Sequence, residues 1–307
     1  MIPAYDDLPS IGDLGVKHSW GVLPASLGTL SFLSRAATLS AARAVRTGET
    51  ISLNVPFDDF LPPLFGRPVL DHSVVETERN IFEDAINDFN PQASSQWDGL
   101  THVRAREHGY YSGVTDPDEA KRTLGIHHWA KNGIVGRGVL VDVARYRDAN
   151  GIAWDPFSGD VVEASELKQI LQSQQLQLQA GDILCVRLGW MAEYRRRVAA
   201  KEDTSRVGDR FSGIASNDAM ARFLWDSHLA AVCVDNPAVE SAPGDRRNGS
   251  LHRRLIPGLG FALAELLDFD ELAERCCESN IYSFLFTAAP LPLTGAASST
   301  ANALAII

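Results

Sequence analysis

A turn followed by a buried strand is predicted by the stretch AGDILCVRLGW, residues 180–190. Its first three residues favour the turn, and the apolar run from Ile183 to Leu188 is typical of a strand that is covered on both faces. Two further runs have the same character, GVLVDV at 138–143 and AAVCV at 230–234. These buried strands indicate that the chain is built on a substantial sheet.

The remaining pattern indicates that helices accompany this sheet. Helical spacing of apolar residues predicts helices over 27–46, 165–178, 217–228 and 270–277, and closing strands are expected at 284–293 and 303–307. Strands and helices alternate only loosely, which favours a mixed α/β domain over a barrel of eight strand–helix units. There is no convincing internal repeat and no Pro-, Gly- or Ser-rich linker, so we expect residues 1–307 to form a single domain. Residues 1–50 are expected to be a helical extension packed on it.

The segment 56–91 is predicted to be rich in loops, because it contains the turn signals PPLFGRP and FNP. Long irregular segments in compact domains are usually disordered or functional. Three aromatic residues, Phe57, Phe60 and Phe65, favour an ordered segment that covers a site.

The composition of the chain argues against several classes of protein. The 307 residues include 28 basic and 39 acidic side chains, for a formal net charge of −11, which argues against a nucleic-acid or anionic-membrane surface. None of the four cysteines has CxxC spacing, so a zinc ribbon or a disulfide scaffold is not favoured. The N-terminus lacks the features of a signal peptide, and the apolar tract 284–293 is short and interrupted by two prolines. We therefore expect a soluble, cytoplasmic protein.

Common catalytic loops are absent from the sequence. It contains no GxxxxGK[ST] phosphate loop, no GxGxxG between a strand and a helix, and no GxSxG nucleophile elbow. The sequence therefore does not favour a nucleotide-binding protein or a serine hydrolase.

Two groups of residues carry side chains that could bind a metal ion. Asp98 and His102 lie four residues apart in the stretch QWDGLTH, 96–102, and Arg104 and His108 follow. The second group lies within 235–265 and comprises Asp235, Glu240, His252 and Glu265. Carboxylate and imidazole groups are good ligands for zinc or manganese, although such residues are also common as surface charges or as satisfied core groups.

The order of several motifs resembles that of the cyclase family, which includes bacterial kynurenine formamidase, isatin hydrolase and trans-dienelactone hydrolases. In the family signature HxGTHxDxPxH, Thr101, His102 and His108 match. Four residues depart from the signature. Asp98 stands where the signature has its first His, and Arg104 stands where it has the metal-bridging Asp. Leu100 and Arg106 stand where it has Gly and Pro. The segments 136–142 and 180–190, the late pair His252 and Glu265, and the motif SQWDGL at 95–100 also resemble family members. The resemblance covers about residues 50–300.

The resemblance implies a swivelling β/β/α fold, a metal-dependent hydrolase and a homodimer or homotetramer. It implies Asp98, His102, His252 and Glu265 as metal ligands. His108 is then the proton carrier and Arg104 the group that stabilises negative charge. Gln96, Trp97 and Trp190 are assigned to substrate binding.

Arg104 cannot bind a metal ion, because its guanidinium stays protonated. We therefore expect one divalent ion, Mn²⁺ or Zn²⁺, with a metal-free site as the alternative. The expected reaction is hydrolysis of a small cyclic amide, lactone or N-formyl amide by a metal-activated water. Ring closure or dehydration at the same site, and a binding protein that has lost catalysis, are the alternatives.

Overall fold

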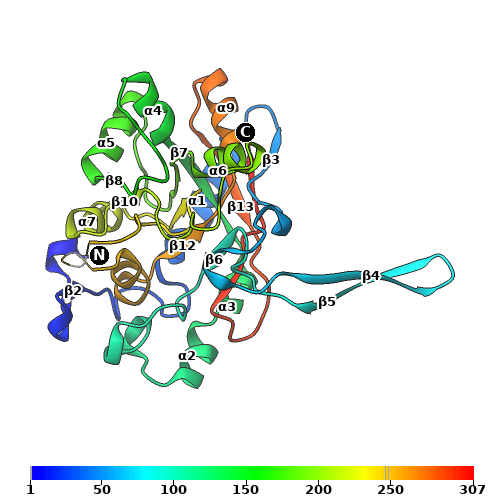
Figure 1. Cartoon of the computed structure of the whole chain (residues 1–307). Coiled ribbons are helices and arrows are strands. Elements are labelled where there is room, and N and C mark those ends of the chain that lie inside the picture. Colours follow the sequence, from blue (N-terminus) through cyan, green and yellow to red (C-terminus); the bar gives the residue numbers. More distant parts are fainter. Residues whose placement is uncertain (1, 246, 248) are drawn as a thin grey trace.

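A twisted sheet of nine strands forms the centre of the computed structural model, which describes residues 2–245, 247 and 249–307 (Figure 1). In spatial order the strands are β14 (Ser298–Thr300), β6 (Gln96–Asp98), β12 (Ala262–Glu265), β11 (Ala231–Val234), β9 (Ile183–Arg187), β7 (Ile134–Asp142), β13 (Ser283–Ala288), β15 (Ala303–Ile306) and β3 (Thr50–Ser52). The four strands from β12 to β7 are parallel, and the flanking strands pair antiparallel. The expected mixed α/β fold is confirmed.

Helices cover both faces of this sheet. Alternate residues of the central strands enter two separate cores, so that Leu184 and Val186 face one side while Ile183 and Cys185 face the other. The first core includes residues from α5 (Ala164–Ser173) and α7 (Asp218–Asp226), and the second includes residues from α2 (Pro117–Leu124), α3 (His127–Asn132) and α9 (Asp270–Ser279). Burial on both faces explains why the strand sequences are apolar without interruption.

The other elements are short and join these layers. The remaining helices are α1 (Arg35–Ala42), α4 (Val143–Ala149), α6 (Trp190–Ala199) and α8 (Leu251–Arg253), which continues into a π-helix over Arg254–Leu259. Two small sheets are formed by β1 (Ser10–Ile11) with β2 (Val16–Lys17) and by β8 (Val161–Val162) with β10 (Gly213–Ile214). Single turns of 3₁₀-helix lie at Tyr5–Asp7, Gly12–Leu14, Gly28–Phe32, Phe57–Asp59, Leu64–Gly66, Arg106–His108 and Tyr111–Gly113.

The single long helix predicted over 27–46 is wrong in its extent. A 3₁₀ segment, Gly28–Phe32, precedes α1, and Leu33 between them has a ψ of 70°, outside the helical range. The Ser34 hydroxyl then accepts a hydrogen bond from the amide of Ala37 and begins α1 as a new helix. The apolar spacing of the segment did not reveal this capping residue.

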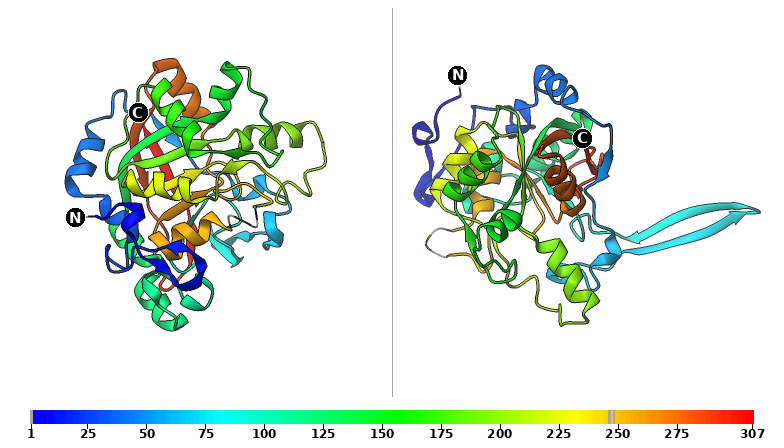
Figure 2. Two further views of the ribbon diagram at one scale, coloured as in Figure 1. Left: turned by 90° about the vertical axis from the view of Figure 1, so that its left-hand side faces the viewer. Right: turned by 90° about the horizontal axis from the view of Figure 1, so that it is seen from above.

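The prediction that 56–91 is irregular is wrong for its second half. Residues 71–88 form an antiparallel hairpin of β4 (Asp71–Glu78) and β5 (Ile81–Asp88), which projects from the body (Figures 1 and 2). The hairpin was missed because neither strand is buried on one face, so the sequence lacks the alternation by which a strand is usually recognised.

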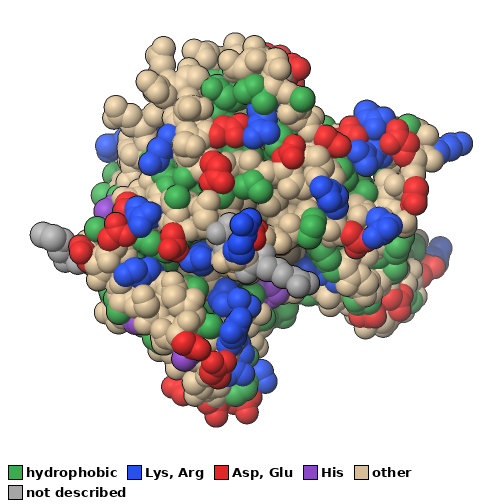
Figure 3. Space-filling model, turned by 60° about the vertical axis from the view of Figure 1, so that its left-hand side comes forward, with side chains coloured by type: hydrophobic (Ala, Val, Ile, Leu, Met, Phe, Trp, Pro, Cys, Tyr) green, Lys and Arg blue, Asp and Glu red, His purple; other side chains and the backbone are tan. Residues whose placement is uncertain are grey.

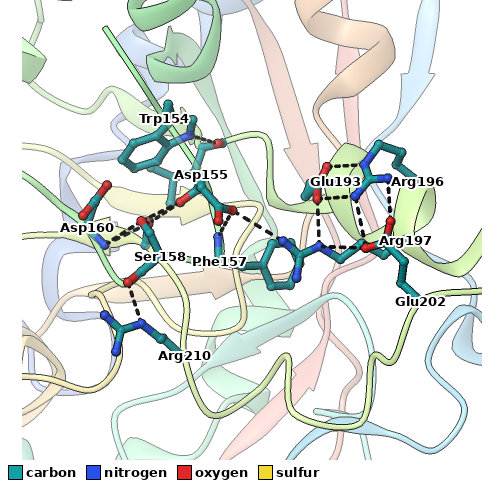
Figure 4. A network of polar contacts seen from close by, with 12 residues as sticks. Trp154, Asp155, Phe157, Ser158, Asp160, Glu193, Arg196, Arg197, Glu202 and Arg210 are labelled. Atoms are coloured by element: carbon teal, nitrogen blue, oxygen red, sulfur yellow. Dashed lines mark hydrogen bonds and ion pairs between the residues drawn. The ribbon is translucent and has the colours of Figure 1, made fainter. Parts of the chain in front are cut away.

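A network of ion pairs fastens the loop 154–160 to α6 (Figure 4). Glu193 accepts hydrogen bonds from Arg196 and Arg197, and the Arg197 guanidinium lies 4.1 Å from the centre of the Phe157 ring. Hydrogen bonds from Arg196, followed by those from Arg197, lower the pKa of Glu193 to about 2 despite its partial burial. The network is structural and holds α6 against its neighbouring loop.

The surface drawn in Figure 3 carries interspersed basic and acidic side chains. Among the described residues, no helix has the length and apolar character needed to cross a membrane.

Candidate metal centre

Strand pairing brings two distant carboxylates to the same face of the sheet. In the antiparallel pair of β6 with β12, Gln96 is opposite Glu265 and Asp98 is opposite Leu263. Residues opposite each other share a face, as do residues two apart in one strand, so Gln96, Asp98 and Glu265 point the same way. Trp97 points to the opposite face by the same rule.

His252, the middle residue of the short helix α8, completes a compact group with these carboxylates. Its Nε2 lies 2.9 Å from Oε1 of Glu265 and 3.5 Å from Oδ2 of Asp98. One potential ligand atom from each of the three residues lies within 4.8 Å of the other two. All three side chains are largely buried, with Asp98 and Glu265 almost fully removed from solvent.

A third carboxylate holds the imidazole from behind. Oε2 of Glu240 lies 2.6 Å from Nδ1 of His252, while Oε1 accepts hydrogen bonds from the Ser250 hydroxyl and the His252 amide. With Nδ1 bonded to Glu240, Nε2 is directed toward Asp98 and Glu265. A carboxylate bonded to the far nitrogen of a histidine is the usual support of a metal-binding imidazole.

The pKa values of these groups depend on one another, because each group changes the charge around the others. Burial alone would lower the pKa of His252, but the charge of Glu240, the hydrogen bonds to Glu240 and Glu265, and the Asp98 carboxylate 3.5 Å away raise it well above its ordinary value. Burial and the charge of Asp98 raise the pKa of Glu265, whereas His252 and His102 outweigh the effect of burial on Asp98 and lower its pKa. A cation is therefore favourable between these carboxylates.

A divalent ion fits both the charge and the hydrogen bonding of the group. Oδ2 of Asp98 is buried and has no hydrogen-bond partner among the described residues, with Nε2 of His252 and of His102 3.5 and 3.6 Å away, which is costly for a carboxylate oxygen. Asp98, Glu265 and Glu240 are three carboxylates, and Arg67 interacts with the first two, so the described residues leave an excess of negative charge when His252 is neutral. Two carboxylates and one imidazole are suitable ligands for a divalent metal ion. Asp98, His252 and Glu265 are the residues that would hold it.

Comparisons with known proteins agree with the motif order. The sequence model of the family described as "Putative cyclase" matches residues 51–241. The chain belongs to the cyclase family. A solved structure of a novel cyclase is 27% identical, with a TM-score of 0.80 over 94% of this chain and 99% of that chain. None of the curated proteins compared with this chain matches it.

Two isatin hydrolase structures share the fold of this cyclase-family chain at lower identity. Isatin hydrolase A from Labrenzia aggregata, bound to benzyl benzoate, is 15% identical with a TM-score of 0.57, covering 89% of this chain and 99% of that chain. An isatin hydrolase bound to the product analogue thioisatinate is 14% identical with the same TM-score, covering 90% and 99%. The matched family region contains Asp98 but ends before His252 and Glu265.

His102, the other predicted ligand, lies at the border of the group. Its Nε2 is 3.6 Å from Oδ2 of Asp98, its ring centre is 6.3 Å from that of His252, and its side chain retains 29% of its exposure. The Gln92 side-chain amide donates to Oδ1 of Asp98 at 2.8 Å and lies 3.4 Å from Nδ1 of His102. His102 is thus next to the buried carboxylate and open to solvent.

The structure does not bring His108 and Arg104 to this group. Nε2 of His108 lies 3.3 Å from Asp13 and 3.5 Å from Glu107 in an exposed cluster. The Arg104 guanidinium lies over the Tyr110 ring and donates to the carbonyl of Thr115. The signature places both residues close to the ligands in sequence, but the chain turns away after His102.

Of the three residues assigned to substrate binding, only Gln96 lies at the site. Its amide donates to Oε2 of Glu265 at 2.7 Å. Trp97 is fully buried in the core, where its indole donates to the carbonyl of Ala301. Trp190 is also fully buried and stacks on Tyr194 and Phe157.

Three residues at the site received no role from the sequence: Glu240, Gln92 and Arg67. The Arg67 guanidinium donates to Oε1 of Gln96 and to the carbonyl of Gln92, and burial lowers its pKa while Glu265 and Asp98 oppose that effect. Glu240 was visible as a member of the late acidic group. Arg67 and Gln92 had no such signal, because both lie in the irregular segment before β6.

Proposed function

We propose that this cyclase-family chain is a metal-dependent hydrolase that opens a small cyclic amide, lactone or N-formyl amide. The buried group of Asp98, His252 and Glu265, with its unpartnered carboxylate oxygen, carries the proposal. A divalent ion bound there would supply a water of lowered pKa and polarise the substrate carbonyl. Two oxygen ligands and one nitrogen ligand favour Mn²⁺ over Zn²⁺ modestly.

His102 is proposed to move the proton in this reaction. Its imidazole is adjacent to Asp98 and partly exposed to solvent, and imidazole is a common proton carrier in enzyme catalysis. Replacing His102 with alanine distinguishes this role from the ligand role expected from the sequence, because loss of a ligand would remove the metal ion and loss of a proton carrier would not.

Arg67 is proposed to stabilise the negative charge that develops on the carbonyl oxygen, the task expected of Arg104. Its guanidinium interacts electrostatically with both Asp98 and Glu265. A fixed guanidinium in a partly buried site acts on developing charge more strongly than one in water.

A hollow beside the proposed site is large enough for a small molecule. It has a volume of about 350 Å³ and is lined by Phe211, Ala238, Ser241 and Glu240, among others. Glu240 joins this hollow to His252. Asp98, His252 and Glu265 do not line this hollow, which is therefore adjacent to the proposed metal centre and not part of it.

The test is a hydrolysis screen of lactones, cyclic amides and aryl formamides, with metal-stripped and Mn²⁺- or Zn²⁺-loaded protein. We expect turnover that requires the metal and is abolished by Asp98→Asn and Glu265→Gln. Metal bound at one ion per chain with no turnover of any substrate class would favour a binding protein. Turnover by the metal-stripped protein at the loaded rate would reject the proposal.

A further inference from the structure

The helix that carries His252 ends against a segment from the N-terminal part of the chain. His252 lies in α8, which continues directly into the π-helix Arg254–Leu259, and β12 with Glu265 begins shortly afterwards. The π-helix is therefore the connection between two of the proposed metal ligands. Single π-helical turns are rare and are frequently found at functional sites.

The carboxyl end of this π-helix cannot satisfy its own backbone. The last four carbonyls of a helix have no donor within it. Pro257, inside the helix, also lacks the N–H group that would otherwise donate to the turn before it. Residues 255–259 are buried, and a buried carbonyl without a partner is costly, so the donors must come from elsewhere in the chain.

The segment 19–29 supplies these donors, one for each of four successive carbonyls. The donors, their acceptor carbonyls and the distances are the Trp20 indole to Pro257 at 2.7 Å, the Ser19 amide to Gly258 at 3.0 Å, the Ser19 hydroxyl to Leu259 at 2.8 Å and the Thr29 amide to Gly260 at 2.8 Å. Figure 2 shows the N-terminal segment, in blue, beside this helix. The segment 19–29 thus forms the cap that the helix lacks.

This cap is a tight and buried contact. Ser19 and Thr29 are fully buried, and a Cβ atom on Gly28 would lie only 2.0 Å from the carbonyl oxygen of Gly260. The Thr29 hydroxyl also donates to the carbonyl of Ala230, directly before β11. The end of the π-helix is therefore held at a fixed place relative to the sheet that carries the two carboxylates of the metal centre.

We propose that Ser19 and Trp20 are positioning residues of the metal centre, because their cap on the π-helix holds the imidazole of His252 against the two carboxylates. This inference rests on the metal-dependent function proposed above. Metal–ligand bonds of about 2.0–2.2 Å leave little tolerance for a displaced imidazole. Glu240 sets which ring nitrogen faces the ion, whereas the cap sets where the ring lies. The matched family region, 51–241, does not include the capping segment.

Two variants weaken the cap without changing any proposed ligand. Trp20→Phe keeps an aromatic ring and loses the indole N–H, and Ser19→Ala loses the hydroxyl. Each has a control that loses a hydrogen bond of the same kind elsewhere. Trp154→Phe loses an indole–carbonyl bond of 2.6 Å, and Thr38→Val loses a hydroxyl–carbonyl bond of 3.0 Å. Urea denaturation measures the stability that each of the four variants loses.

Two measurements on the full chain test the proposal. Hydrogen–deuterium exchange of the metal-stripped protein should become faster across 251–261 in the two cap variants and not in the controls. Titration with Mn²⁺ should show an affinity weakened by about 3- to 10-fold in each cap variant, the equilibrium effect of about one hydrogen bond. The controls should keep the parent's affinity even where they lose as much stability, which a merely structural role of the cap would not produce.

The outcomes separate this inference from the proposed function. Unchanged exchange across 251–261 in both cap variants would reject the cap itself. Faster exchange with the parent's Mn²⁺ affinity would reject the positioning role and leave the metal-dependent function standing. Equal losses of affinity in the cap variants and the controls would also reject it. A parent that binds no Mn²⁺ would reject the proposed function and this inference together.

Discussion

The hydrogen bond between Glu240 and His252 gives the most specific prediction about metal affinity. Oε2 of Glu240 lies 2.6 Å from Nδ1 of His252, so the carboxylate selects the tautomer whose Nε2 is free to bind an ion. Glu240→Leu removes this acceptor and leaves a buried N–H without a partner. Glu240→Gln keeps an acceptor oxygen but loses the charge.

Loss of such a supporting carboxylate usually weakens metal binding by about 10- to 100-fold, or about 1.4–2.8 kcal/mol. We expect the upper end of this range for Glu240→Leu and the lower end for Glu240→Gln. Isothermal titration of metal-stripped protein with Mn²⁺ and Zn²⁺ measures the difference. Ser250→Ala removes a neighbouring hydrogen bond to Glu240 and serves as the matched control, with an affinity close to that of the parent.

The affinity must be measured at several pH values, because Glu240 also raises the pKa of His252. Without Glu240 the pKa of His252 is lower, so the proton that the metal ion must displace from this imidazole is lost more easily. This partly offsets the weaker metal binding at low pH. The loss of affinity should therefore be largest above the pKa of His252. A folded Glu240→Leu variant with the parent's affinity at high pH would refute the supporting role of Glu240.

Three further predictions concern the site and the stability of the fold. His102→Ala should keep one ion per chain while turnover falls by about 10²- to 10³-fold; loss of the ion, measured by elemental analysis, would instead make His102 a ligand. The parent's Mn²⁺ affinity, measured by titration, should fall as pH falls, because His252 has a raised pKa in the metal-free protein and binds a proton in competition with the ion. Glu193→Gln should cost about 1 kcal/mol of unfolding free energy near pH 7, after allowance for solvent screening. Because the folded pKa of Glu193 is lowered to about 2, this difference is fully present above its ordinary pKa of 4.5 and disappears as pH falls toward 2. Urea denaturation at pH 7 and pH 3 measures it, and an equal difference at both would contradict the assignment.

The central strands could be predicted from sequence because burial on both faces leaves a simple apolar signal. The runs around 138–142, 183–187 and 231–234 all appear as strands within two residues of their expected bounds, apart from an earlier start of β7 at Ile134. The hairpin of β4 and β5 could not be predicted in this way, since its side chains alternate in neither burial nor polarity. Its strands are defined by their pairing with each other.

The grouping of three of the four predicted ligands could be anticipated from the sequence, whereas the residues around them could not. Asp98, His252 and Glu265 were expected from motif order, and the pairing of β6 with β12 explains how residues 167 positions apart meet. His108 matched the same signature, yet the backbone after His102 carries it to an exposed cluster with Asp13. Sequence spacing fixes which residues are close along the chain, whereas the direction of a loop depends on contacts made elsewhere.

The most direct test of the metal centre is a crystal structure of the protein grown with Mn²⁺, with anomalous data collected at the manganese edge. We predict a single strong peak per chain, bonded to Asp98, His252 and Glu265 at metal–ligand distances of about 2.0–2.2 Å. No peak at these residues, or a peak only at the exposed cluster of Asp13, Glu107 and His108, would contradict the account.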